Sequence, residues 1–234
     1  MTGSDMSTRQ DYITAIGHLV GGELPLGEAE RIFAISAALK KYSGHRPRIV
    51  VEDEVGNASF DYAVTLLADW TEGFSTIKSV EYPVDDTEAT ASILDEEAWR
   101  IYQKPAGKYL RLLEDTPAAT ENLRIDYTAL HTCTDAVCTV PAFDEEALQM
   151  LAAALFCEML AAYYAQTSDS TIQADSVDHK SKASEYSARA RAYRKMYYDH
   201  LGIKEGETPA ASVTKDQNIA GSWGAKMTHG RGTR

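Results

Sequence analysis

Residues 150–166 read MLAAALFCEMLAAYYAQ, an almost unbroken apolar run in a chain whose formal net charge is −12. Such a run fits a membrane span, a helix in a protein core, or a helix that another protein covers. Glu158 lies at its middle, so insertion of about 20 residues into a bilayer would carry a carboxylate into the hydrocarbon. We therefore expect a helix of a soluble protein and no contact with a membrane.

The run is apolar on every side, which is unusual for the surface helix of a monomer. One face is expected to pack in its own domain, through Leu148, Leu151, Leu155 and Met159. The opposite face needs a second cover, which the middle of the chain or a neighbouring subunit can provide. The candidates for a seam with a neighbouring subunit are Ala154, Ala161 and Tyr164.

Helical periodicity also marks both ends of the chain. Residues 7–20 and 26–42 predict two helices, the second ended by Gly44. After Pro141, acidic residues precede the alanine-rich run, as a helix N-terminus prefers. A last helix is predicted over residues 175–201, with a core stripe of Tyr186, Ala190, Tyr193, Tyr197 and Leu201.

Between these helices the period changes to two. Polar and apolar residues alternate in SFDYAVTL (59–66) and NLRIDYT (122–128), which predicts half-buried strands. Further strands are expected at residues 48–55, 75–82, 99–103 and 108–114. The acidic stretch 85–97 is either a loop or a short helix.

The predicted fold is therefore α+β: a helical bundle formed by N-terminal and C-terminal helices, an inserted antiparallel β module and an extended C-terminal arm. The corresponding divisions are 1–45, 46–140, 141–203 and 204–234. The last of these is rich in Gly, Ser, Thr and Ala and cannot build its own core.

Composition restricts the function. The 234 residues are 44% hydrophobic, enough for one good core or two modest ones. The acidic balance argues against a protein that wraps DNA, although not against one that lets DNA slide past. Acidic residues near the N-terminus predict no signal peptide, so Cys133, Cys138 and Cys157 are expected to be free thiols in a reducing cytoplasm.

The sequence offers little chemistry. No glycine-rich phosphate loop and no nucleophile turn is present. His131, Cys133 and Cys138 lie within eight residues but lack a fourth zinc ligand nearby, so a loop with ordinary thiols is the better interpretation. We predict no catalytic, cofactor-binding or metal-binding residues and therefore no enzyme.

Five successive segments resemble head-to-tail connector (adaptor) proteins of tailed bacteriophages, and the resemblance covers roughly residues 10–203. The segments are FSTIKSVEYPV (74–84), EEAWRIYQ (96–103), LRIDYTALHT (123–132), TVPAFDEEALQMLAAALFCEMLAAYYAQTSD (139–169) and DSVDHKSKASEYSARARAYRKMYYDHLG (175–202). The resemblance implies a helical bundle, often with an inserted β domain, in a ring of usually twelve subunits beneath the portal. It also implies that DNA passes through the ring and that a terminal arm grips the portal or a neighbour, with Trp223 as its anchor here.

The resulting hypothesis is a non-enzymatic virion protein of the phage neck, made in the host cytoplasm. Its expected partners are other copies of itself, the portal protein, a tail or stopper protein, and double-stranded DNA that passes without specific binding. Basic residues of the last helix either pair with the portal or a neighbour or are simply solvated: Arg189, Arg191, Arg194 and Lys195. The alternatives are a tail-completion or baseplate protein, and a cytoplasmic enzyme or ligand-binding protein that uses the β module.

Overall fold

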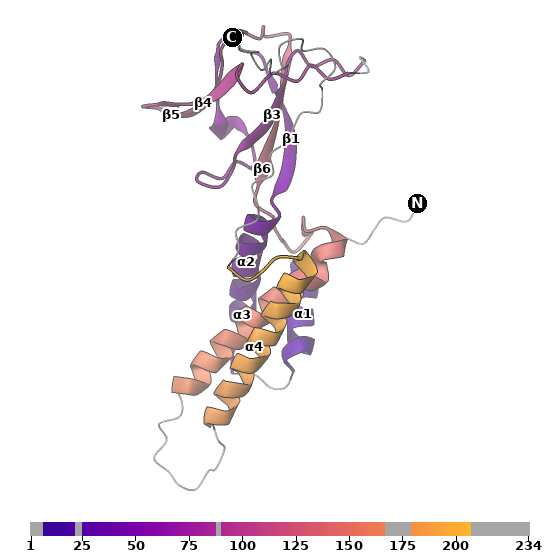
Figure 1. The fold of residues 1–234 in the computed structure, drawn as a ribbon, viewed down its shortest axis with the longest axis vertical. Helices are drawn as coiled ribbons and strands as arrows, with labels where there is room; N and C mark the ends of the chain where they lie inside the picture. Colours follow the sequence, from indigo (N-terminus) through magenta and orange to yellow (C-terminus); the bar gives the residue numbers. More distant parts are fainter. Residues whose placement is uncertain (1–6, 22–24, 88–89, 167–178, 207–234) are drawn as a thin grey trace, which may run out of the picture.

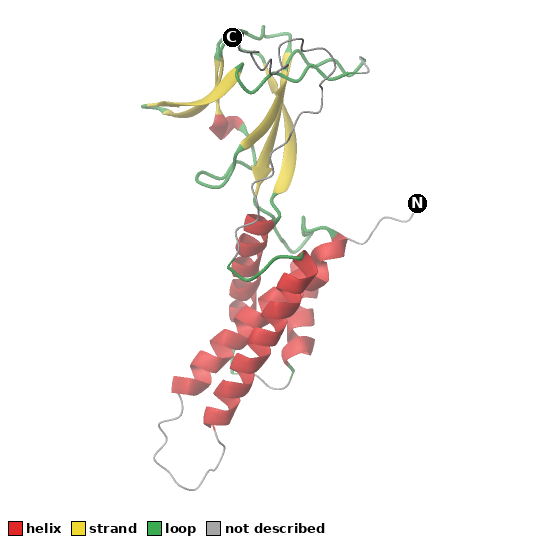
Figure 2. Cartoon of the chain, in the orientation of Figure 1, coloured by secondary structure: helices red, strands yellow, loops and turns green. Residues whose placement is uncertain are grey.

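The computed structural model describes residues 7–21, 25–87, 90–166 and 179–206, with only the backbone described at 179–181. The described residues form a mixed α+β structure of four α-helices and two small antiparallel sheets. The strands lie between the second and third helices in the chain, and the helices and strands occupy different parts of the molecule (Figures 1 and 2). The predicted order of helices, strands and helices is confirmed.

The four helices are α1 (Arg9–Val20), α2 (Glu28–His45), α3 (Glu145–Gln166) and α4 (His179–Leu201). Helix α1 begins with a capping box, in which Thr8 and Asp11 bond each other's backbone N–H groups. The predicted end of α2 at Gly44 is wrong, because the helix runs through this glycine to His45. Pro47 explains the later end, since a proline disfavours helical geometry at the residue before it, here Arg46.

The first sheet has the order β1-β6-β3 and the second the order β2-β5-β4. Their strands are β1 (Arg48–Val55), β2 (Asp61–Ala63), β3 (Ile77–Glu81), β4 (Trp99–Lys104), β5 (Gly107–Leu112) and β6 (Asn122–Ala129). The short turn Pro105-Ala106 joins β4 and β5 in a hairpin.

The prediction of one strand over residues 59–66 is only partly correct. The strand stops at Ala63, and Val64–Leu66 forms a 3-10 turn, η1. The turn places Leu67 in the core and leaves Leu66 exposed. Alternation over residues 122–127 of β6, by contrast, is as predicted, with Leu123, Ile125 and Tyr127 buried.

Two separate hydrophobic cores hold the chain together. The core of the helical part gathers side chains from all four helices, the largest of them Tyr12, Tyr42, Phe156 and Tyr197. The core of the sheets gathers Tyr62, Leu110, Leu112, Leu123, Ile125 and Tyr127 with smaller residues. The predicted stripe of α4 packs in the first core, with Ala190 and Tyr197 buried and its other members half-buried.

The packing around α3 shows that one residue predicted for the subunit seam is buried inside its own chain. Helices α1 and α2 pack on α3, and α4 packs along its length, so most of its N-terminal half is enclosed by its own chain. Ala154 is 0% exposed and is therefore not available for a seam with a neighbour. Leu148 and Leu151 are buried as predicted, whereas Leu155 and Met159 are half-buried.

One stretch of the described chain, Ala142–Gln166, is long and apolar enough to cross a membrane. Half of its most apolar window is buried inside the protein, and the core helix of a soluble protein meets the same criteria.

The expectation of free thiols is wrong for two of the three cysteines. Cys133 and Cys138 face each other across an isolated antiparallel bridge and form a disulfide. Cys157 is free and buried in the helical core, where burial raises the pKa of its thiol to about 11. A thiol with so high a pKa is protonated and unreactive at neutral pH.

Candidate functional site

A cluster of buried polar groups lies where the helices meet the sheets. At its centre is Asp144, the last residue of a 3-10 turn, η2 (Ala142–Asp144), that leads into α3. Its carboxylate accepts hydrogen bonds from the Tyr42 hydroxyl at 2.6 Å and from Arg46 Nη1 at 2.7 and 2.8 Å. His200 Nε2, near the end of α4, lies 2.9 Å from the same carboxylate. The cluster thus joins α2, α3 and α4 through one side chain.

Electrostatics in this cluster favour a charged Asp144. Burial alone would raise the pKa of its carboxyl, but hydrogen bonds from Tyr42, His200 and Arg46 outweigh burial and lower it below 3.8. The lowered pKa means that the carboxylate is charged at neutral pH. Such a fully bonded carboxylate orients the ends of three helices and suits a structural role rather than proton transfer.

His131 extends the cluster toward the sheets. Its Nε2 lies 3.1 Å from the carbonyl oxygen of Arg46, and its Nδ1 lies 3.0 Å from the carbonyl oxygen and 3.2 Å from the hydroxyl of Thr139. Both ring nitrogens therefore face a carbonyl oxygen, and a neutral ring donates to only one of the two. Burial lowers the pKa of this imidazole, which favours the neutral form.

The three residues weighed as zinc ligands do not form a metal site. Cys133 and Cys138 bond each other, and both ring nitrogens of His131 are used inside the fold. Within residues 7–21, 25–87, 90–166 and 179–206, no group of three or more His, Cys, Asp or Glu side chains is placed to hold a metal ion.

The basic residues of α4 divide into two kinds. Arg189 donates to the carbonyl oxygen of Val20 at 3.0 Å and pairs with Glu185, while Arg194 pairs with Glu158 of α3. These two guanidinium groups therefore hold the helices of their own chain together. Arg191 and Lys195 are exposed, and Trp223 lies outside the described residues.

Two of the three residues predicted for a subunit seam lie near the end of α3. Ala161 and Tyr164 are both half-buried, and the Tyr164 ring stacks on Tyr186 of α4 at 5.6 Å between centroids. This tyrosine stack joins α3 to α4 in the same chain.

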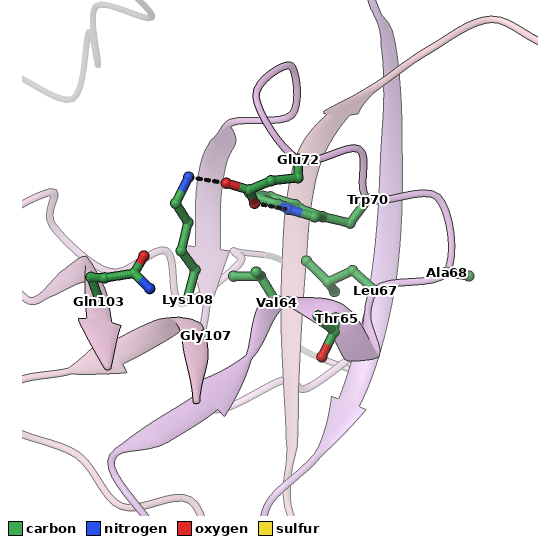
Figure 3. A pocket seen from close by; sticks show the side chains of 9 residues that line it. All are labelled: Val64, Thr65, Leu67, Ala68, Trp70, Glu72, Gln103, Gly107 and Lys108. Carbon is green, nitrogen blue, oxygen red and sulfur yellow. Dashed lines mark hydrogen bonds and ion pairs between the residues drawn. The ribbon is translucent and has the colours of Figure 1, made fainter. Parts of the chain in front are cut away.

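An open hollow of about 460 Å³ lies in the β module, between η1 and the β4–β5 turn (Figure 3). Val64 and Leu67 form apolar walls, and Trp70 lies beside them. Figure 3 shows the Glu72 carboxylate held between the Lys108 ammonium and the Trp70 indole N–H. The ion pair joins β5 to the loop that follows η1.

The outward surface of the first sheet is apolar and acidic. Because opposed residues of antiparallel strands share a face, this surface follows from the register. We call it the acidic face; it comprises Ile49, Val51, Asp53 and Val55 of β1, Asn122, Arg124 and Asp126 of β6, and Ser79 and Glu81 of β3. Its cation Arg124 binds Asp53 at 2.7 Å and also pairs with Glu81. Three carboxylates thus stand against one cation.

The corresponding surface of the second sheet is basic and aromatic. We call it the basic face; it comprises Arg100, Tyr102 and Lys104 of β4 with Tyr109 and Arg111 of β5. Lys104 and Arg111 share the carboxylate of Asp61, at 2.5 and 2.6 Å. Arg111 also lies over the Tyr102 ring at 3.9 Å. Three cations thus stand against one acid.

Sequence reasoning missed both faces and the cluster around Asp144. A signal for the basic face was available, because residues 99–112 contain four cations and no acid. The cluster had no such signal, since Tyr42 and Arg46 lie 102 and 98 residues before Asp144 in the chain.

Comparison with known proteins gives no relative: no protein-family model matches the sequence, and no curated protein matches it.

Proposed function

We propose that this chain is a non-enzymatic structural protein of a bacteriophage neck. In this proposal, identical copies form a ring, with twelve subunits as the expected number, that joins the portal to the tail and lets DNA pass. The resemblance to head-to-tail connectors supports it, and the two most extensive resembling segments fall largely on α3 and α4. We also propose that α1 to α4 act as the helical bundle of such a connector, with the sheets as its insertion.

The row of exposed β-branched residues on β1 is the observation that carries the proposal. Ile49, Val51 and Val55 are 52%, 57% and 62% exposed and lie on one side of an edge strand. No charged residue or proline lies between Ile49 and Val51. An exposed apolar edge strand of this kind tends to pair with another chain. The exposed apolar row is explained if an assembly partner covers this strand.

The net negative charge supports the proposal that DNA passes through the ring. The chain as a whole carries −12, so a channel lined by its acidic surface repels the phosphate backbone and lets DNA slide. The exposed residues Arg191 and Lys195 are proposed to contact the portal or a neighbour, and Ala161 and Tyr164 remain proposed for the seam. Residues 204–234, with Trp223, are proposed as the arm that grips the portal.

Electron microscopy of the protein mixed with the portal of the same phage tests this function. The expected result is a ring of added density beneath the portal. A variant that ends at Gly202 tests the arm separately and is expected to dock poorly, whereas Lys40→Glu, an exposed change on α2, is a control expected to dock normally. Portal particles that stay bare in the presence of the full chain would reject the proposal.

A further inference from the structure

The two outward faces of the β module are complementary in charge. The acidic face offers three carboxylates and one cation, with Asp86 adding a fourth carboxylate at its border through its bond to Arg124 at 2.9 Å. The basic face offers three cations and one acid, with two tyrosines between the cations. Each face therefore carries the charge that the other lacks, and opposite charges across an interface select the correct partner.

Both faces also end in strand edges able to receive another strand. In the first sheet, the far edge of β3 is partly covered, because Leu94 N–H donates to the Val80 carbonyl and Tyr82 N–H to the Ser92 carbonyl. Strand β1 is the other edge and pairs only with β6 within the described residues. Strand β4 is the corresponding edge of the second sheet and pairs only with β5 in the same part of the chain. Unprotected edges of this kind are sites of strand pairing.

The edges point away from each other. Figure 1 shows the β4–β5 hairpin projecting on the opposite side of the module from β1. A contact between two different surfaces on opposite sides of one molecule is head-to-tail, and repeating it generates a ring or a filament.

We propose that the basic face on the β4–β5 hairpin of one copy docks on the acidic face beside β1 of the next copy. The contact places Arg100 against the carboxylates of the acidic face, and it covers Ile49, Val51 and Val55 with Tyr102. This inference rests on the proposed ring and assigns the β module a role in closing it.

Two single variants test the contact, one on each face. Arg100→Glu reverses a charge on the basic face, and Val51→Lys places a charge in the apolar row of the acidic face. Both side chains are exposed, so the fold is expected to persist, which far-UV circular dichroism checks. By sedimentation velocity each variant is expected to self-associate about tenfold or more weakly than the wild type. Matched controls on other surfaces, Lys40→Glu and Leu66→Lys, are expected to associate normally.

Mixing the two variants gives the decisive result. The Arg100→Glu protein keeps an intact acidic face, and the Val51→Lys protein keeps an intact basic face. An equimolar mixture therefore restores one contact per pair and is expected to yield dimers at concentrations where each variant alone is largely monomeric. If each face instead paired with the same face of another copy, mixing the variants would not restore association. A mixture that stays monomeric therefore overturns the inference. Arg100→Gln, which removes charge without reversing it, is expected to weaken association less.

Other outcomes also count against the contact. Wild-type protein that shows no association at about 1 mM overturns it. Binding of a short DNA duplex that Arg100→Glu abolishes, with self-association unchanged, assigns the basic face to nucleic acid instead. Rings that both variants form normally on the portal overturn this inference and leave the proposed function standing, whereas portals left bare by the wild type overturn the proposed function.

Discussion

Two buried tyrosines of the helical core differ in what their hydroxyl groups contact. The Tyr42 hydroxyl donates to Asp144 at 2.6 Å, whereas the buried Tyr12 hydroxyl has no hydrogen-bond partner among the described residues. Tyr42→Phe is therefore expected to lower the free energy of unfolding by about 1–3 kcal/mol, because it leaves a buried carboxylate with one donor fewer. Urea unfolding followed by circular dichroism measures the loss.

Tyr12→Phe is the matched control, since it removes the same atom from a site without a partner. It is expected to leave the free energy of unfolding unchanged or to raise it by up to about 1 kcal/mol, because an unpaired buried hydroxyl is unfavourable. Equal losses in the two variants would contradict the proposed role of the bond between Tyr42 and Asp144.

The lowered pKa of Asp144 predicts how stability depends on pH. A carboxyl whose pKa is lower in the folded state stabilises the fold fully above its unfolded pKa, and the contribution is lost as pH falls through the folded pKa. The wild type is therefore expected to lose stability below about pH 4, and Asp144→Asn to lose less over the same range. Arg46→Gln removes two of the hydrogen bonds and raises the folded-state pKa of Asp144, so it is expected to make the acid-dependent loss of stability smaller. An Asn variant with the wild-type pH profile of urea midpoints would contradict this assignment.

At the scale of elements, α4 supplies the donors that α1 lacks at its end. The last carbonyl groups of a helix have no partner inside it. Here the Tyr193 hydroxyl donates to the Leu19 carbonyl at 2.7 Å, and Arg189 donates to the Val20 carbonyl and places its positive charge at the negative end of the helix. The end of α1 is thus fixed by tertiary contacts as well as by its own turn.

Tyr193→Phe is expected to destabilise the last turn of α1 by about 1 kcal/mol, the net value of one hydrogen bond. Hydrogen exchange of the amides at the end of α1 measures the effect, which should be about fivefold faster exchange there. Tyr198→Phe is the control on the same helix, because its ring packs on His45 and Tyr197. Unchanged exchange in α1 after Tyr193→Phe would show that the carbonyl has another partner.

The sequence predicted the existence and type of these helices and strands better than it predicted which elements pack against each other. Strand β1 has the predicted bounds, because turn-forming residues follow it at Gly56 and Pro47 precedes it. The two-sided apolar pattern of α3 was correct, but period alone does not say which helix covers a face. Helix α4, with its charged and tyrosine-rich sequence, covers α3 through aliphatic and aromatic surface as well as through the Arg194 to Glu158 pair.

The candidate sites were less predictable than the elements, for a physical reason. Periodicity assigns a side chain to a face, whereas a site depends on which faces meet, and that is decided by long-range packing. Asp144 illustrates this, since the sequence indicates only an acidic helix start. Asp61 is similar: alternation places it on the outer side of a strand, but only the sheet register brings it to Arg111 and Lys104.

At the scale of the whole molecule, the two hydrophobic cores share no buried residue. They are joined by a polar junction in which the Arg46 side chain bonds Asp144, and the Arg46 carbonyl oxygen lies 3.1 Å from His131 Nε2. Polar contacts of this kind fix an orientation but transmit less stability than a continuous apolar core. The helical part and the sheets are therefore expected to open separately.

Two large-to-small substitutions, one in each core, test whether the helical part and the sheets open separately. Leu123→Ala removes a fully buried side chain from the sheets, at an expected cost of about 2–5 kcal/mol, and Phe156→Ala removes one from the helices, at about 3–5 kcal/mol. Native-state hydrogen exchange is expected to accelerate in β1, β3 and β6 for the first variant, with α2 and α3 still protected, and in the helices alone for the second. Acceleration through the whole chain in both variants would contradict this, because it would mean that the junction couples the two cores into one cooperative unit. Independent opening would instead allow a β module that adjusts to a neighbouring copy while the helices keep their packing.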